Sequence, residues 1–203
     1  MKRRLSLGRF IDLLPQNRHL YRICKRYLNR YDGNNNSDMY TNGEMWWLQR
    51  VLPECRVVFD VGANVGNWAA AALSINSTVS VHCFEPSEAA FKKLSDRSFD
   101  GASIYLNHLG LSETAGETTL FVFEPASTVN SLYQRDGIEI TQTQTEKVRL
   151  DTVDAYCRRE GIDRIDLLKI DTEGHELMVL NGAAEMLKKS NISRIQFEYG
   201  GAY

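Results

Sequence analysis

The sequence predicts an α/β fold built on a doubly wound, mainly parallel sheet. The largely apolar run Val57–Val61 is typical of a strand buried on both faces, and Gly62 and Gly66 follow it in a tight turn toward a helix. Further short apolar runs alternate with longer amphipathic stretches, a rhythm that needs crossover connections and makes the strands parallel. With 203 residues, of which 43% are hydrophobic, the chain can bury one sizeable core and carry an appendage.

The elements of this sheet follow one another in a regular order. The short apolar runs, rich in Val, Ile, Leu and Phe, predict five strands over residues 56–61, 79–84, 103–107, 165–170 and 192–198. The stretches before and between them have helical spacing of their apolar residues and predict helices over residues 43–51, 65–75, 87–97, 152–160 and 175–189.

An inserted pair of antiparallel strands is expected between the third and fourth strands of the sheet. Residues 116–124 and 146–150 have the composition of two such strands. The segment between them, residues 125–145, is rich in Ser, Thr, Gln and Asn. Long polar loops in compact domains often carry function, so this segment is a candidate functional loop.

The N-terminal arm differs from the rest of the chain in its charge. Residues 1–30 contain nine Lys or Arg and a single acid, Asp12, a net charge of +8, although the whole chain carries −2. The cluster DGNNN at residues 32–36 predicts a linker, so we expect a basic helical arm over 1–36 and one domain over 37–203. The arm could contact an anionic membrane surface, bind a phosphorylated acceptor, or dock on its own acidic domain. Nucleic acid is not expected, because no recognition motif accompanies the arm.

The cysteines and the apolar segments indicate a cytoplasmic protein. Four scattered cysteines contain no C-x-x-C pair, so neither a zinc site nor a disulfide framework is predicted. The basic start is a poor signal peptide because Arg9 and Asp12 interrupt its apolar stretch. No run of about eighteen apolar residues is present that could span a bilayer.

The first strand and the one after it predict a site for a nucleoside. Glu85 ends the second strand, where a carboxylate can accept both hydroxyls of a ribose. The loop reads G-A-N-V-G, with Asn64 in place of the second glycine of a dinucleotide fingerprint, which disfavours a pyrophosphate. Asp60 would repel a diphosphate but suits the ammonium group of S-adenosylmethionine. The candidate binding residues for this cofactor are Asp60, Gly62, Asn64, Gly66 and Glu85.

A second motif, LLKIDTEGHE at residues 167–176, places ionisable groups at the end of the fourth strand. Lys169, Asp171, Glu173 and His175 would lie where open α/β sheets bind their ligands. Charged groups near a buried strand end are costly unless they bond one another or a substrate. An acid-rich helix start explains Glu173 and Glu176, but it does not explain a lysine and an aspartate at the end of an apolar strand.

Taken together, these segments resemble the FkbM family of S-adenosylmethionine-dependent methyltransferases. The resemblance is carried in order by DVGANVGNWA, FEPSEAAFKKL, LNHLGLSETAGE, KIDTEGHE and FEYG. It implies a Rossmann-like class I methyltransferase fold and O-methylation of a hydroxyl on a sugar, glycan or natural product. It implies that Asp60, Gly62, Asn64 and Gly66 form the donor loop and that Glu85 is the ribose acid. Such a domain normally has a further helix and two more strands, so we expect the sequence to be incomplete at its C-terminus.

The sequence does not decide which group at the end of the fourth strand is the catalytic one. The candidates are Asp171, Glu173 and His175, with His175 the better base by its intrinsic pKa and Asp171 the better placed. A divalent metal on Asp171 and Glu198 is not favoured, because two carboxylates are few ligands. Two other functions remain: an NAD-linked oxidoreductase, and a non-catalytic nucleoside-binding module that pairs with a partner through its fifth strand.

Overall fold

A computed structural model of the chain describes residues 17–32, 38–99, 103–122 and 144–197. The chain divides into two compact units, residues 1–47 and 48–203. Within the described ranges, no helix is both long and apolar enough to cross a membrane.

The first unit contains the helix α2 (Arg18–Asp32), which lies within the basic arm where helices were expected. The helix α3 (Glu44–Val51) then leads into the second unit, as predicted, and the short 3-10 helix η1 (Leu52–Glu54) follows it directly. Leu48 of α3 and Leu52 of η1 are fully buried, so both helices contribute a side chain to the core of the second unit.

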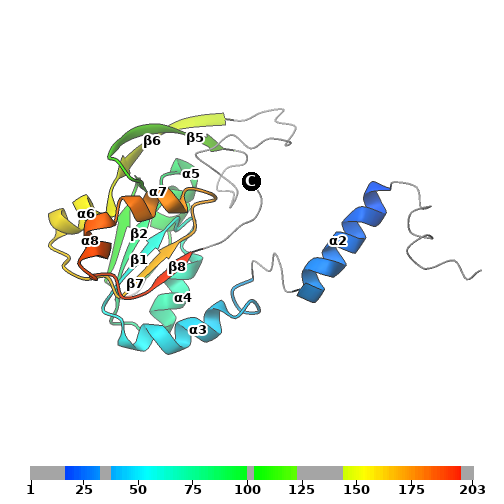
Figure 1. The fold of residues 1–203 in the computed structure, drawn as a ribbon, viewed down its shortest axis with the longest axis horizontal. Coiled ribbons are helices and arrows are strands. Elements are labelled where there is room, and N and C mark those ends of the chain that lie inside the picture. The colour runs from blue at the N-terminus through cyan, green and yellow to red at the C-terminus, as the bar shows by residue number, and fades with distance from the viewer. Residues whose placement is uncertain (1–16, 33–37, 100–102, 123–143, 198–203) are drawn as a thin grey trace, which may run out of the picture. The chain divides into compact units, whose positions relative to one another are not determined.

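The main sheet has five strands in the order β3-β2-β1-β7-β8, and all of its neighbours are parallel (Figure 1). These strands are β1 (Val57–Val61), β2 (Ser80–Phe84), β3 (Ile104–Asn107), β7 (Leu167–Ile170) and β8 (Ile195–Phe197). The five predicted strands and their parallel arrangement are therefore confirmed, with each strand somewhat shorter than expected. Because Val61 pairs with both Phe84 and Ile170, the strands β1, β2 and β7 end at one edge of the sheet.

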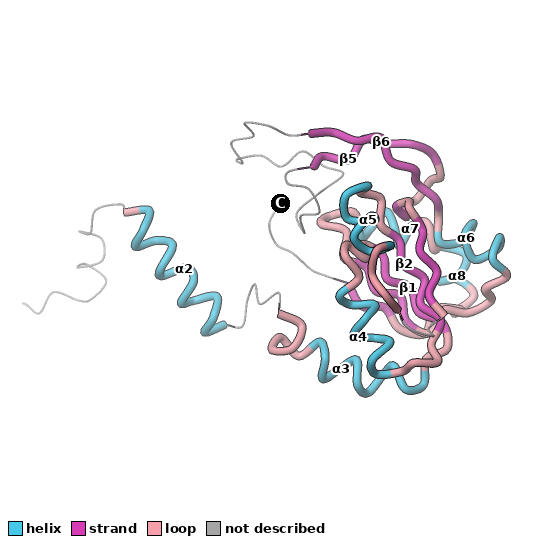
Figure 2. The backbone as a smooth tube through the Cα atoms, turned by 180° about the vertical axis from the view of Figure 1, so that it is seen from behind, coloured by secondary structure: helices cyan, strands magenta, loops and turns pink. Residues whose placement is uncertain are grey.

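Helices cover both faces of this sheet, as a doubly wound fold requires. They are α4 (Asn67–Ile75), α5 (Glu88–Ser95), α6 (Val153–Glu160), α7 (Glu176–Asn181) and α8 (Ala184–Lys188). Tyr156 of α6, Val179 of α7 and Met186 of α8 share one core with Phe59 and Ile170 of the sheet. Views from both sides show α6, α7 and α8 grouped together and α4 lying across the sheet from them (Figures 1 and 2).

The helical stretch expected over residues 175–189 is present, but it consists of two short helices, α7 and α8. The interruption falls at Gly182 and Ala183. A Cβ atom at Gly182 would overlap the backbone carbonyl of Ser112, so the chain passes this point at a distance that only glycine permits. This close approach is a long-range contact, which a helical pattern in the sequence does not reveal.

A small second sheet has the strand order β4-β6-β5. Its antiparallel pair, β5 (Gly116–Val122) and β6 (Gln144–Asp151), confirms the predicted insertion. The two-residue strand β4 (Gly110–Leu111) pairs in parallel with the end of β6 and was not predicted. Most of the polar loop expected over 125–145 lies outside the described residues.

Candidate donor-binding site

Three segments converge at the edge where β1, β2 and β7 end. The glycine loop 62–66 follows β1, Glu85 follows β2, and the loop 171–175 follows β7. The amides of Gly62 and Ala63 both donate to the carbonyl oxygen of Phe84 at 3.0 Å, so the glycine loop turns over the end of β2. The sequence motifs are thus brought together at the carboxyl edge of the sheet, the usual ligand edge of this fold class.

The glycine loop has a backbone that side chains rarely permit. Gly62, Asn64 and Gly66 have φ angles of 80°, 48° and 79°, all in the left-handed region. Glycine enters this region without steric cost, and asparagine is among the residues that tolerate it best. The G-A-N-V-G spacing therefore defines one particular turn.

The close neighbours of the two glycines are parts of the protein itself. A Cβ atom at Gly62 would overlap the backbone carbonyl of Asp171, and one at Gly66 would lie 2.6 Å from Cδ1 of Leu94. A side chain at Gly62 would therefore collide first with the end of β7. Gly62 lets the two loops touch, so it couples the glycine loop to Asp171.

Glu85 is buried and holds the glycine loop in place. One carboxylate oxygen accepts the amide of Asn64 at 2.8 Å, and the other accepts the amide of Ser87 at 2.9 Å. Burial raises the pKa of Glu85 to about 7, although the two amide bonds oppose that rise. Each oxygen retains a second lone pair. The carboxylate can therefore accept two further hydroxyl groups, which is the fit that a ribose requires.

Asp60 has a different neighbour from the one expected. Its side chain is 0% exposed, and Oδ1 lies 2.9 Å from the ammonium nitrogen of Lys169 on the neighbouring strand β7. The carboxylate is therefore buried against a cation of the protein itself, and its attraction of a donor's ammonium group stays a prediction. Lys169 also lies 3.5 Å from the Gly62 carbonyl oxygen and 3.5 Å from the Asp171 carboxylate. Through Lys169, the ion pair therefore contacts both the glycine loop and the loop 171–175.

The loop 171–175 is organised by Glu176. A single oxygen of this carboxylate accepts the amide and the hydroxyl of Thr172 at 3.0 Å and the amide of Gly174 at 3.1 Å. Glu173 and Gly174 both have positive φ angles, 55° and 106°. The side chain of Asp171, at the start of this loop, is 42% exposed. Glu176, which the sequence suggested only as a helix-start acid, is thus the residue that shapes this loop.

His175 lies deeper than Asp171 and bonds to a residue that the sequence did not single out. Its Nε2 atom is 3.0 Å from the hydroxyl oxygen of Ser112, and both side chains are buried. Burial lowers the pKa of His175, although Glu176 and Glu113 raise it, so the imidazole is neutral at pH 7. Ser112 lies in the segment LNHLGLSETAGE, directly after β4, but nothing in that segment indicates a contact with His175, 63 residues further along the chain.

Comparison with known proteins gives the family. Residues 60–202 match the family model described as the Methyltransferase FkbM domain, a match that begins at Asp60 and includes both loops. The chain belongs to this family. It is 27% identical, over 163 residues and 78% of its length, to the hexuronic acid methyltransferase AglP of Haloferax volcanii. The alignment spans 64% of that relative. A solved methyltransferase FkbM from Methylobacillus flagellatus KT is 18% identical, with a TM-score of 0.43, and the match covers 66% of this chain and 30% of that one.

Among the described residues of this FkbM domain, no group of three or more His, Cys, Asp or Glu side chains could hold a metal ion. Glu198, named with Asp171 as a potential metal ligand, lies outside the described residues.

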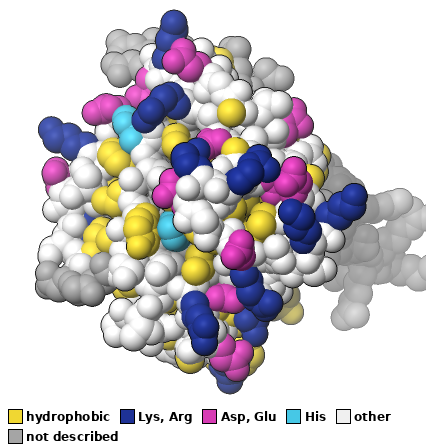
Figure 3. All heavy atoms as spheres, turned by 90° about the vertical axis from the view of Figure 1, so that its left-hand side faces the viewer, with side chains coloured by type: hydrophobic (Ala, Val, Ile, Leu, Met, Phe, Trp, Pro, Cys, Tyr) yellow, Lys and Arg dark blue, Asp and Glu magenta, His cyan; other side chains and the backbone are white. Residues whose placement is uncertain are grey.

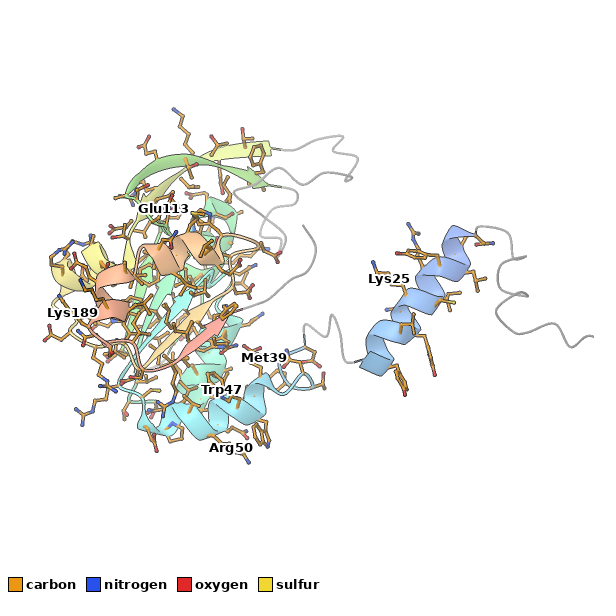
Figure 4. The ribbon with its side chains drawn as sticks, viewed as in Figure 1. Lys25, Met39, Trp47, Arg50, Glu113 and Lys189 are labelled. Carbon is orange, nitrogen blue, oxygen red and sulfur yellow. The ribbon has the colours of Figure 1, made fainter. Side chains whose placement is uncertain are left out.

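A shallow hollow lies on the surface near α7 and α8, apart from the loops that follow β1 and β2. It is lined by Glu113, Thr114, Leu180, Asn181, Ala184 and Leu187. The amide of Asn181 donates to Glu113 at 3.2 Å across it, and Figure 4 shows Glu113 close to α7. Two of the polar side chains in this hollow, Glu113 and Asn181, are therefore bonded to each other.

Proposed function

We propose that this chain is an S-adenosylmethionine-dependent O-methyltransferase acting on a hydroxyl of a sugar, glycan or natural product. The observation that carries the proposal is the buried Glu85 carboxylate, which accepts the Asn64 amide of the glycine loop and retains lone pairs for two hydroxyls. Membership of the FkbM family supports the donor, because the family is one of methyltransferases. We assign the methyltransferase domain to residues 37–203 and the basic arm to 1–36.

The donor would be held by the residues that join the two loops. Glu85 would accept the ribose hydroxyls, while Gly62, Asn64 and Gly66 give the loop the left-handed turn that exposes its backbone. We assign Asp60 an indirect part, in which it fixes Lys169 beneath the Gly62 carbonyl. S-adenosylmethionine supplies a methyl group on a positively charged sulfur, which is already a good electrophile.

The protein must then orient the acceptor and remove one proton. Positioning of two reactants contributes about 7–11 kcal/mol of barrier reduction, and a placed base about 10²–10⁴-fold in rate. We propose Asp171 as the group that meets the acceptor hydroxyl, because its side chain is half-exposed at the site. The neutral His175, bonded to Ser112, is the alternative base, and Glu173 lies between them in the same loop.

The class of acceptor is suggested by the relative whose name states one. AglP is called a hexuronic acid methyltransferase, so a uronic acid or a related glycan is the first acceptor to test. The face that carries α6 and α8 has Lys, Arg, Asp and Glu mixed together, with no broad patch of one charge (Figure 3). This face does not favour nucleic acid as a partner. All four cysteines are free thiols, which supports a reducing compartment such as the cytoplasm.

The proposal is tested by methyl transfer from labelled S-adenosylmethionine to uronic acid-containing glycans. Asp171→Asn and His175→Ala should each lower the rate of transfer while donor affinity persists, because a base acts chiefly in the transition state. Asp163→Asn is the matched control, since this exposed aspartate precedes the opposite end of the same strand, β7. Wild-type rates in both site variants would exclude the assigned roles. If neither the wild type nor any variant methylates these glycans, the proposed acceptor class is excluded.

A further inference from the structure

The helix α2 presents two faces of opposite character. Leu20, Ile23, Tyr27 and Tyr31 recur at helical spacing and form an apolar face together with Tyr21 and Leu28. Ile23, Tyr27 and Tyr31 are 66%, 67% and 79% exposed. An apolar face of this size is normally covered in a working protein, because its exposure to water is unfavourable.

The other face of α2 is cationic. Arg22 and Arg26 are four residues apart and therefore share one side of the helix. Along its length the helix contains Arg18, Arg22, Lys25, Arg26 and Arg30 against the single acid Asp32. The helix therefore has five cations against one acid, within an arm, residues 1–30, that has nine cations against one acid.

Lys25 marks the border between the two faces. Its ammonium nitrogen lies 5.8 Å from the centre of the Tyr21 ring, so the side chain runs beside an aromatic residue of the apolar face (Figure 4). A long basic side chain at such a border can bury its stem in apolar surroundings and keep its charge at an anionic layer. This is the arrangement of helices that lie in a membrane interface.

We propose that α2 binds flat on the surface of a bilayer that contains anionic phospholipids. Its apolar face would enter the boundary between head groups and acyl chains, and its cations would meet the lipid phosphates. Three of the apolar residues are tyrosines, which suit a wet interface better than a dry protein core, where each hydroxyl would need a partner. A 15-residue helix is about 22 Å long, too short to span the roughly 30 Å hydrocarbon layer, so it lies on the membrane.

Charge complementarity indicates what covers the apolar face of α2. A protein surface could cover the apolar face, but it would leave the excess of cations without a matching layer of anions. An anionic bilayer supplies both at once, an apolar interior and a continuous sheet of phosphates. The proposal does not depend on the methyltransferase chemistry, because α2 lies in a different unit from the donor site.

Vesicle flotation of the full chain tests this proposal. The chain should float with vesicles of phosphatidylcholine containing about 30 mol% phosphatidylglycerol, bind pure phosphatidylcholine far less, and lose binding as salt shortens the screening length. Arg22→Gln combined with Arg26→Gln should weaken binding about 30-fold, since each basic residue near the surface is worth about fivefold. Ile23→Ser combined with Tyr27→Ser should weaken binding to the anionic vesicles at every salt concentration.

The control variant removes the same charge elsewhere. Lys188→Gln combined with Lys189→Gln alters two exposed lysines at the end of α8 and should float like the wild type (Figure 4). Equal loss in this control would mean that total charge, and not α2, directs binding, which would overturn the proposal. Absence of flotation by the wild type would overturn it too. If both α2 variants float like the wild type but melt at a lower temperature, the helix docks on its own protein and not on the membrane. Donor affinity, measured alongside, reports separately on the proposed methyltransferase function.

Discussion

Replacement of Lys169 by methionine should destabilise the domain strongly, because it leaves a buried carboxylate without its cation. Asp60 is 0% exposed and Lys169 is 6% exposed, with 2.9 Å between Oδ1 and the ammonium nitrogen. Removal of one partner from a buried pair costs about 3–5 kcal/mol. A domain of ordinary stability, about 5–15 kcal/mol, would therefore lose about a fifth or more of its free energy of unfolding.

The double variant Asp60→Asn with Lys169→Met separates this cost from simple loss of packing. It contains no uncompensated buried charge, so it should be more stable than Lys169→Met alone, and the two substitutions should be strongly non-additive. Urea denaturation followed by far-UV circular dichroism measures each free energy of unfolding. Arg158→Met is the control, because Arg158 and Glu185 form an exposed pair at 3.3 Å that should contribute no more than about 1 kcal/mol. The reasoning is refuted if Lys169→Met costs no more than this control, or if the two site substitutions simply add.

Three further predictions concern the site. The raised pKa of Glu85 means that its carboxyl keeps a proton in the folded state while the unfolded chain loses it, so stability should fall as pH rises from about 4.5 to 7. The loss is on the order of 3 kcal/mol, and thermal melts across this pH range should show it in the wild type and not in Glu85→Gln. Gly62→Ala should destabilise more than Gly161→Ala, since both positions have positive φ angles but only the first is packed against Asp171. Denaturant titrations compare the two, and equal costs would contradict the close contact. A chelator should leave methyl transfer unchanged, and a loss shared with Glu198→Gln would instead support a metal.

The fold could be predicted because its signals are local. Each buried strand, such as Val57–Val61, is a short apolar run, and the left-handed turn after it needs residues like Gly62 and Asn64. The alternation of strands and helices then restricts the topology to a parallel sheet. Helix ends were less predictable. Gly182, between α7 and α8, approaches the backbone of Ser112 more closely than a Cβ atom would allow, and Ser112 is far away in the sequence.

The site could be located from the sequence, but its internal contacts could not. Glu85 and Asp171 were expected at one sheet edge, and strand pairing brings their strands there. The ion pair of Asp60 with Lys169 joins residues 109 positions apart, and it depends on the register of β1 against β7. No motif encodes that register. Asp60 was therefore expected to face a ligand, whereas the folded chain buries it against a lysine.

Calorimetric titration with S-adenosylhomocysteine and with NAD tests the central claim most directly. Both ligands present a ribose to Glu85, but only the first lacks a pyrophosphate, which the G-A-N-V-G loop disfavours. We expect saturable binding of S-adenosylhomocysteine, loss of about 1–3 kcal/mol of that binding in Glu85→Ala, and no measurable binding of NAD. Exposed Glu117→Ala on β5 should bind as the wild type does. Tighter binding of NAD, or wild-type affinity for S-adenosylhomocysteine in Glu85→Ala, would contradict the account.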